Sequence, residues 1–208
     1  MRELIDSVHR LDGARGANAY LIEADDRSIV VDTGVPSGAK RLVAELEAAR
    51  IPAITDVVLT HYDPDHVGAA AAVQRATGAT VWLGAADARI LRGEVAPPTR
   101  TRRMMRRFNR PGRADLPQLT ELPDDAEFEV APGVVVVPAP GHTPGHHLVR
   151  WRGVAFIGDA GIMSRGRLIN LPGMLISDQG QADATLAAIT AMRPRLVLPG
   201  HGRAGRLD

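Results

Sequence analysis

The sequence predicts an α/β fold in which sheets are covered by helices. Short apolar runs of strand length recur along the 208 residues, and segments with helical spacing of apolar side chains follow several of them. The chain also divides into two strand-rich halves, each of which finishes with a helix–strand unit. This mixture of elements is typical of layered sheets with helices on their faces.

In the first half, the stretch ANAYLIEADDRSIVVDTGVP predicts two strands joined by a turn near Asp25–Arg27. A helix is predicted over Val35–Arg50, where apolar residues recur at helical spacing. The buried strand ITDVVLT precedes a second helix over Pro64–Thr77, which Gly78 should end. The strand TVWLG and a short helix over Ala85–Leu91 complete this half.

A segment of different composition separates the halves. Residues 92–120 hold four Pro and, between Arg92 and Arg113, eight Arg, so we expect an irregular or partly helical insert. Three strands follow in GVVVVPAP, HHLVRW and GVAFIGD, then a helix over Gln181–Met192 and a last strand, RLVLPGH. We expect a single domain over residues 1–208, with the insert as part of it.

Composition excludes several kinds of chemistry. The chain has no Cys, which excludes disulfides, thiolate ligands and a Cys nucleophile. Any metal must be held by imidazole, carboxylate and water, a donor set that suits zinc, iron or manganese. The formal net charge of +1 gives no whole-chain signature of nucleic-acid binding. The N-terminal MRELIDSVHR lacks the apolar region of a signal peptide, and no apolar run could span a membrane, so we expect a cytoplasmic protein.

Histidine and aspartate residues stand directly after the predicted strands. The positions are Asp32, the His61–His66 part of LTHYDPDH, His142, Asp159 and His201. Residues at strand ends can converge on one edge of a sheet while the strands fix their backbones. Each residue alone could be a turn residue, but chance explains poorly why His or Asp stands beside Gly at four strand ends. Glycine there lets the backbone approach a site closely.

Asp63 and Asp65 have an alternative role. Asp63 precedes Pro64, and because Pro favours the first helical position, Asp63 is a good helix N-cap. Asp65 would then lie in the first turn, where a negative charge suits the helix dipole. From these residues alone, helix capping and metal binding rank level.

Taken together, the motifs resemble the metallo-β-lactamase fold superfamily. They are THYDPDH at 60–66, Gly141-His142, Gly158-Asp159 and Gly200-His201, with VVDTG at Asp32 as the first motif. Their order, spacing and strand-end placement match, and the resemblance runs from about Ala19 to Gly202. It implies a four-layer αββα sandwich with two divalent metal ions at one edge. Zinc is the first expectation, with iron and manganese as alternatives.

The resemblance also implies a role for each residue. The first metal would be held by His61, Asp63 and His142, and the second by Asp65, His66 and His201, with Asp159 bridging the two. Asp32 would orient a ligand or support the loop, and His146 would be structural or lie behind a ligand. We expect His9 and His147 to lie outside the site.

The sequence departs from the common family pattern at Asp63, where most members have His. A carboxylate there is a harder ligand and adds a negative charge. It moves the preference somewhat towards iron or manganese, although zinc also accepts carboxylate.

These features predict hydrolysis of a small-molecule ester, lactone, thioester or similar bond by a hydroxide that bridges two ions. Metal binding lowers the pKa of water to roughly 7, so hydroxide exists at neutral pH. Asp65 would accept a hydrogen bond from that hydroxide while binding the second metal. The alternative is a non-haem iron oxidoreductase of the persulfide dioxygenase type. A third hypothesis is a non-catalytic binding module with a degenerate site.

The Arg-rich stretch RTRRMMRRFNRPGR has two interpretations. Arg103 and Arg106 could bind an anionic substrate group, because Arg forms bidentate contacts with carboxylate and phosphate. A nucleic-acid contact is conceivable but less expected. We prefer a solvated basic face, or a homodimer contact that uses the segment 104–108. Tyr62 could reach the pocket or pack under the loop, and packing is preferred.

Overall fold

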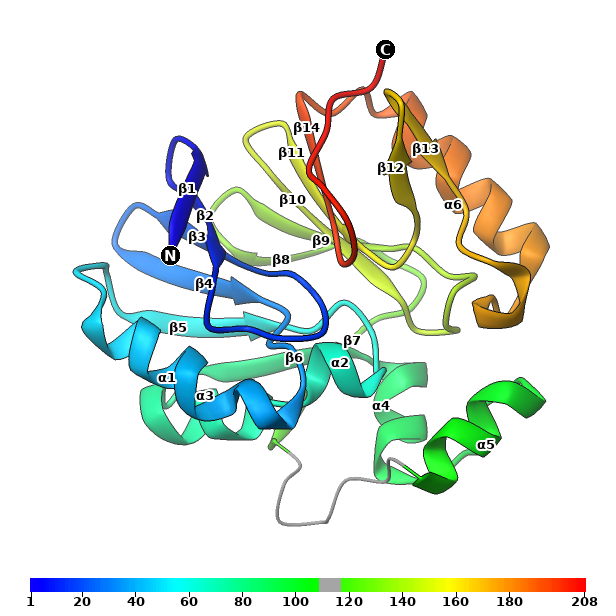
Figure 1. Cartoon of the computed structure of the whole chain (residues 1–208), viewed down its shortest axis with the longest axis horizontal. Coiled ribbons are helices and arrows are strands. Elements are labelled where there is room, and N and C mark those ends of the chain that lie inside the picture. Colours follow the sequence, from blue (N-terminus) through cyan, green and yellow to red (C-terminus); the bar gives the residue numbers. More distant parts are fainter. Residues whose placement is uncertain (109–116) are drawn as a thin grey trace.

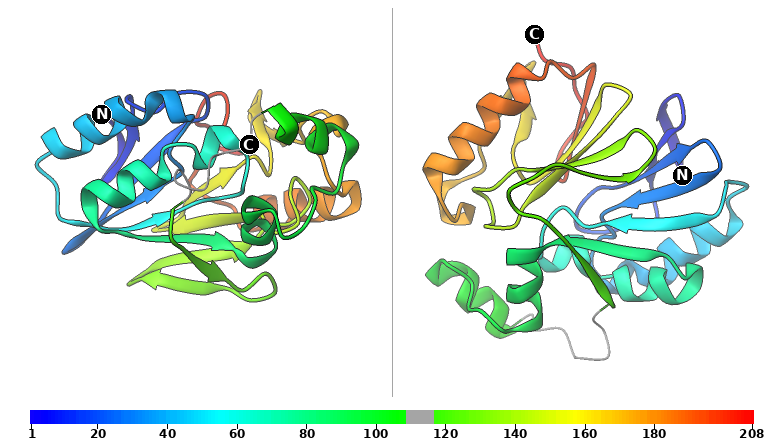
Figure 2. Two further views of the ribbon diagram at one scale, coloured as in Figure 1. Left: turned by 90° about the horizontal axis from the view of Figure 1, so that it is seen from below. Right: turned by 180° about the vertical axis from the view of Figure 1, so that it is seen from behind.

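The structure, a computed structural model, describes residues 1–108 and 117–208, with side chains up to residue 104 and from residue 117 onward. These residues form four layers in the order helices, sheet, sheet, helix (Figure 1). The view from behind in Figure 2 shows the same order, with α1 and α3 on one outer face and α6 on the other. None of the described helices has both the length and the apolar composition needed to cross a bilayer.

The first sheet has seven strands in sequential order. They are β1 (Arg2–Ile5), β2 (Val8–Leu11), β3 (Ala19–Ala24), β4 (Arg27–Val31), β5 (Ile54–Val58), β6 (Thr80–Gly84) and β7 (Leu119–Leu122). Strands β1 to β4 are antiparallel neighbours, whereas β4 to β7 run parallel. The carboxyl ends of β4 and β5 therefore meet at the same edge of the sheet.

The second sheet has five strands in the order β14-β11-β10-β9-β8. Their bounds are β8 (Phe128–Ala131), β9 (Val134–Pro138), β10 (His147–Trp151), β11 (Val154–Gly158) and β14 (Leu196–Pro199). Only β11 and β14 are parallel among these pairs, so their carboxyl ends also share an edge. A separate hairpin pairs β12 (Ile162–Ser164) with β13 (Arg167–Ile169).

The helices cover the outer faces of the two sheets. They are α1 (Ala39–Ala48), α2 (Pro64–Val67), α3 (Ala70–Thr77), α4 (Ala85–Arg92), α5 (Arg100–Phe108) and α6 (Gln179–Ala191), with short 3-10 turns η1 (Pro36–Gly38) and η3 (Gly173–Leu175). Helices α1, α3 and α4 share one apolar core with the first sheet, and α6 shares another with the second.

Strand residues alternate between these cores, as the two-residue period of a strand requires. On β4, Val30 packs under the helices, whereas Ile29 and Val31 face the second sheet. On β11, Phe156 faces the first sheet, whereas Ile157 packs towards α6. Both sheets are thus buried on two faces, which confirms the predicted αββα sandwich.

Most predicted elements are present, with one correction. The hairpin near Asp25–Arg27 is confirmed by β3 and β4, and the predicted helix from Val35 begins as the 3-10 turn η1. The single helix predicted over Pro64–Thr77 is wrong, because it divides into α2 and α3. The division occurs where the Ala69 amide donates to Thr33 Oγ1, 3.3 Å away, and so leaves the helical hydrogen-bond pattern.

Candidate metal centre

The strand ends bring seven predicted ligands together at one edge of the sandwich. The structure groups them as His61, Asp63 and His142, as His61, His66 and Asp159, and as Asp65, His66 and His201. Within each group the ligand atoms all lie within 4.8 Å of one another. The residues follow β5, β9, β11 and β14, so strands of both sheets fix this edge.

Asp32 stands behind two of the histidines. Its carboxylate accepts hydrogen bonds from Thr60 Oγ1 and from His66 Nδ1, both at 2.8 Å. Since Thr60 Oγ1 donates to Asp32, it accepts from His61 Nδ1, which lies 3.0 Å away. Each ring thus uses Nδ1 as the donor and leaves the lone pair of Nε2 for the site. Asp32 therefore fixes the His66 ring directly and the His61 ring through Thr60.

Three buried ligand atoms have no hydrogen-bond partner within the part of the chain that the structure describes. His61 Nε2, His66 Nε2 and Asp159 Oδ1 are buried and have no partner among the described residues. His66 Nε2 lies 3.4 Å from Asp159 Oδ1. Buried polar atoms are costly unless they are hydrogen-bonded or bind a metal, so this donor set fits a divalent cation. Asp65 Oδ2 and His201 Nε2, 3.1 Å apart, complete the group on its more exposed side.

The charges of these residues stabilise one another. Burial would raise the pKa of Asp159, but the charge and hydrogen bond of His66 together with the charges of His61 and His142 lower that pKa. Burial would lower the pKa of His66, but Asp32 and Asp159 raise it well above its ordinary value. The hydrogen bond to Asp65 raises the pKa of His201. The carboxylates thus remain ionised at neutral pH, as metal ligands must be.

Asp63 occupies the N-cap position of α2, but its side chain does not cap the helix. Asp63 Oδ2 faces His142 Nε2 at 3.2 Å and His61 Nε2 at 3.4 Å, while Asp63 Oδ1 accepts from Arg102 Nη1. Burial opposes the charge of Asp63, yet the neighbouring His142 and His61 imidazoles and the charge of the Arg102 guanidinium hold its pKa well below the usual range. Of the two alternatives for this residue, side-chain capping is excluded.

Asp87 is a site-supporting residue that the sequence analysis missed. It is fully buried on α4 and accepts hydrogen bonds from Tyr62 N at 3.1 Å, Thr143 Oγ1 at 2.6 Å and Gly145 N at 2.8 Å. It therefore ties the His61–Asp63 loop to the loop that carries His142. Burial raises the pKa of Asp87 to about 6, although these hydrogen bonds oppose the rise. Its position inside a predicted helix gives no sequence signal of this role.

The other histidines lie behind or outside the group. His146 Nε2 accepts from the Asp159 amide at 3.2 Å, and its ring stacks on His61 with centroids 5.1 Å apart. His147 contacts the backbone carbonyls of Gly145 and Pro123. His9 pairs with the Glu23 carboxylate instead.

The predicted substrate residues are placed differently from one another. Tyr62 is 7% exposed and belongs to the core under the first sheet, so it packs beneath the loop. Arg103 donates to the backbone carbonyls of Pro97 and Pro98. Arg106 lies outside the described side chains. The Arg that reaches the site is Arg102, which was not singled out from the sequence.

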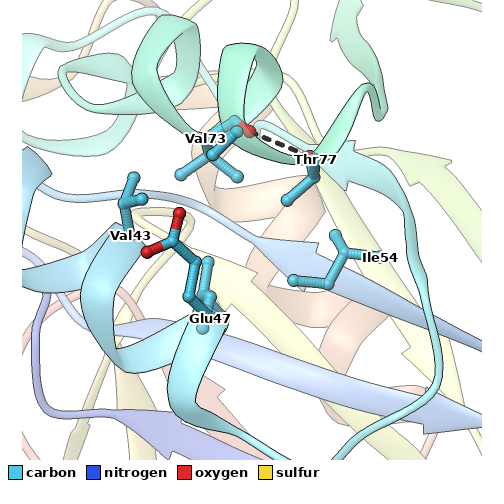
Figure 3. Close-up of a pocket in the computed structure, with 7 residues that line it drawn as sticks. Val43, Glu47, Ile54, Val73 and Thr77 are labelled. Carbon is cyan, nitrogen blue, oxygen red and sulfur yellow. Dashed lines mark hydrogen bonds between the residues drawn. The ribbon is translucent and has the colours of Figure 1, made fainter.

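An apolar hollow lies away from the candidate metal centre. It is lined by residues of α1, β5 and α3, including Val43, Glu47, Ile54, Val73 and Thr77 (Figure 3). Ile54 begins β5, whereas the candidate ligands follow the other end of that strand. None of the residues that line this hollow is a predicted site residue.

Comparisons with known proteins agree with this geometry. A family model described as the metallo-beta-lactamase superfamily matches residues 12–201. The chain is 28% identical over 203 residues to the beta-lactamase-like protein 2 homolog of Drosophila melanogaster, covering 90% of this chain and 59% of that protein. It is 32% identical over 190 residues to the hydroxyacylglutathione hydrolase of Fuscovulum blasticum, covering 88% and 61%. The chain thus spans less than two thirds of the length of these relatives.

The fold is shared with solved structures. TTHA1623 in a di-iron-bound form aligns with a TM-score of 0.70 and 25% identity, covering 91% of this chain and 89% of that one. The family model covers most of the chain, and the four layers agree with this structure. The chain therefore belongs to the metallo-beta-lactamase superfamily.

Proposed function

We propose that the protein is a metal-dependent hydrolase of small-molecule esters, lactones or thioesters. The observation that carries this proposal is the trio of buried, unpartnered ligand atoms His61 Nε2, His66 Nε2 and Asp159 Oδ1. The hydroxyacylglutathione hydrolase relatives support a thioester within the substrate class. The two ions, the cytoplasmic location and a homodimer remain predictions.

Most of the residues at the site would hold a cation, and one of them, Asp65, would also accept a proton. His66, Asp65, His201 and Asp159 would hold a divalent ion, and His61 has a ligand atom within 4.8 Å of those of His66 and Asp159. Such an ion would lower the pKa of a bound water to roughly 7 and polarise the scissile carbonyl. Asp32 and Thr60 would keep His66 and His61 in their working orientations.

Asp65 is the proposed proton acceptor. Its side chain is 34% exposed, so it stands where water and substrate can enter, and its Oδ2 lies 3.1 Å from His201 Nε2. Burial opposes its charge, but the hydrogen bond from His201 and the charges of His66 and His61 keep the pKa of Asp65 below its usual value. An ionised carboxylate at this point can accept a proton from attacking water.

The test is a panel of esters, lactones, thioesters and phosphodiesters hydrolysed by protein loaded with zinc, manganese or iron. We expect turnover that a chelator abolishes and added metal restores. Asp65→Asn should lower kcat roughly 100-fold or more, as loss of a general base does. Asp125→Asn, which removes the same charge from an exposed position, should leave kcat unchanged.

Absence of any chelator-sensitive hydrolysis across the panel would overturn the proposal. Iron-dependent oxygen consumption with a thiol or persulfide, in place of hydrolysis, would favour the oxidoreductase alternative instead. Equal loss of activity in Asp65→Asn and Asp125→Asn would remove the specific role of Asp65.

A further inference from the structure

Arg102 places a guanidinium inside the candidate metal centre. Among the side chains that the structure describes, it is the only buried Arg, with 4% exposure. It comes from α5, which lies beyond α4 and contacts η3 (Figure 1). Burying a charge is costly unless it is paired and hydrogen-bonded, so its contacts must compensate for the lost hydration.

These contacts are built largely from the first ligand group. Arg102 Nη1 donates to Asp63 Oδ1, and Nη2 lies 2.9 Å from His142 Nε2. Nη2 also donates to the carbonyls of His142, at 3.2 Å, and Leu175, at 2.8 Å. The guanidinium carbon lies 5.5 Å from the centroid of the Tyr62 ring, within cation–π range.

The guanidinium contacts two side chains that a first metal ion would need as ligands. Arg has donors only, so His142 Nε2 must accept from Arg102 with the lone pair that would otherwise bind metal. Asp63 Oδ1 is likewise engaged by Arg102. Of the three ligands of the first position, His142 is therefore not available to an ion while Arg102 is in place, and Asp63 has only Oδ2 left, beside a positive charge.

The second position shows the opposite arrangement. His66 Nε2 and Asp159 Oδ1 are buried without a hydrogen-bond partner in the described part of the chain. His66 Nε2 lies 3.4 Å from Asp159 Oδ1 and 4.0 Å from Asp65 Oδ2. No Arg or Lys side chain is paired with Asp65 or Asp159 among the described ion pairs. Among the described residues, the chain thus supplies a guanidinium to the first position and none to the second.

We infer that Arg102 takes the place of the first metal ion, and that the protein binds one divalent cation, at His66, Asp65, His201 and Asp159. The carboxylate of Asp63 explains why a guanidinium can dock there, because its planar fork matches a carboxylate. At the first position, the positive charge of Arg102 balances the negative charge of Asp63. This inference rests on the proposed metal-dependent function, and it proposes one ion where the sequence resemblance implies two.

Metal stoichiometry tests the inference without reference to catalysis. Chelator-treated protein is titrated with Mn²⁺, bound metal is counted after equilibrium dialysis, and low-temperature electron paramagnetic resonance distinguishes an isolated ion from an exchange-coupled pair. The wild-type protein should bind one equivalent and give the spectrum of an isolated Mn²⁺. Arg102→Met keeps an apolar stem and removes every donor. Its affinity for a second equivalent should be about tenfold or more higher than that of the wild-type protein, and its spectrum should be that of a coupled pair.

Arg103→Met is the matched control. It removes the same charge one residue along α5, from an exposed side chain that contacts only backbone carbonyls in the described structure. It should bind one equivalent, so any general effect of charge is separated from the effect of Arg102. If circular dichroism shows that Arg102→Met is unfolded, Arg102→Gln takes its place in the same metal titration, with the same expected result.

Each remaining outcome counts against the inference. Two equivalents of similar affinity in the wild-type protein would overturn it, while leaving the proposed hydrolase intact. A single equivalent in the folded Arg102 variants would show that something other than the guanidinium keeps the first position empty. No bound metal in the wild-type protein would overturn the proposed function itself.

Discussion

At the scale of single residues, the backbone position of Asp63 could be predicted from the sequence, but the direction of its side chain could not. The Asp-Pro pair correctly predicted that Asp63 stands at a helix start, because Pro sets the backbone of the first helical residue. It could not predict where the carboxylate points. That direction depends on Arg102 and His142, 39 and 79 residues away. Arg102 itself was one of eight Arg in the stretch 92–113, with no local signal to mark it.

Asp32 is the residue whose function is most sharply testable. Asp32 has a φ of +59°, a region that Asn also adopts, so Asp32→Asn should keep the backbone. In one orientation the amide NH₂ replaces the oxygen that accepts from Thr60 Oγ1 and His66 Nδ1, and in the other it faces the Thr60 backbone N–H, so neither orientation keeps every hydrogen bond that the carboxylate makes. We therefore expect metal affinity to fall roughly 10- to 100-fold.

Chelator competition at fixed pH measures this affinity. The exposed variant Asp125→Asn serves as the control, and its Kd should equal that of the wild-type protein. An unchanged Kd in Asp32→Asn would mean that the orientation of His66 does not depend on the carboxylate.

At the scale of elements, strand ends were the reliable signal. Apolar runs of strand length followed by His or Asp located β5, β11 and β14, and with them His61, Asp159 and His201. The periodicity failed at α2 and α3, because Thr33 draws the Ala69 amide out of the helix. Strands β1, β2, β7, β8, β12 and β13 were also missed, because each is three or four residues long and, unlike the equally short β14, none is a continuous apolar run of four residues. So short a segment carries too little alternation to identify a strand.

Asp87 shows how one helix fixes two loops. In Asp87→Asn, the amide NH₂ faces the backbone N–H of Tyr62 in one orientation and the backbone N–H of Gly145 in the other. One buried donor then loses its acceptor, so we expect the free energy of unfolding to fall by about 1–3 kcal/mol. Urea unfolding of the metal-free protein measures this change.

Asp125→Asn again provides the comparison, because the same chemical change at an exposed position should cost little. If the two variants have the same unfolding free energy, Asp87 does not join the loops in the way that its hydrogen bonds indicate.

At the scale of the whole molecule, the αββα sandwich explains why distant motifs form one site. Ligands follow strands in both sheets, and parallel pairs β4–β5 and β11–β14 direct their carboxyl ends to the same edge. The sequence resemblance predicted this architecture, and the seven side chains that it implies as ligands lie close together in the structure. It could not predict the occupant of the first position, because that depends on how α5 packs beside η3. The number of cations is thus a property of the packed molecule.

The central claim is that this edge of the sandwich holds a divalent cation. Anomalous X-ray diffraction at the absorption edge of the metal, from crystals of the metal-loaded protein, tests it most directly. We predict an anomalous peak bonded to His66 Nε2, at the roughly 2.0–2.1 Å typical of a zinc–imidazole bond. Metal-loaded crystals with no peak between His66, Asp159 and His201 would contradict the claim.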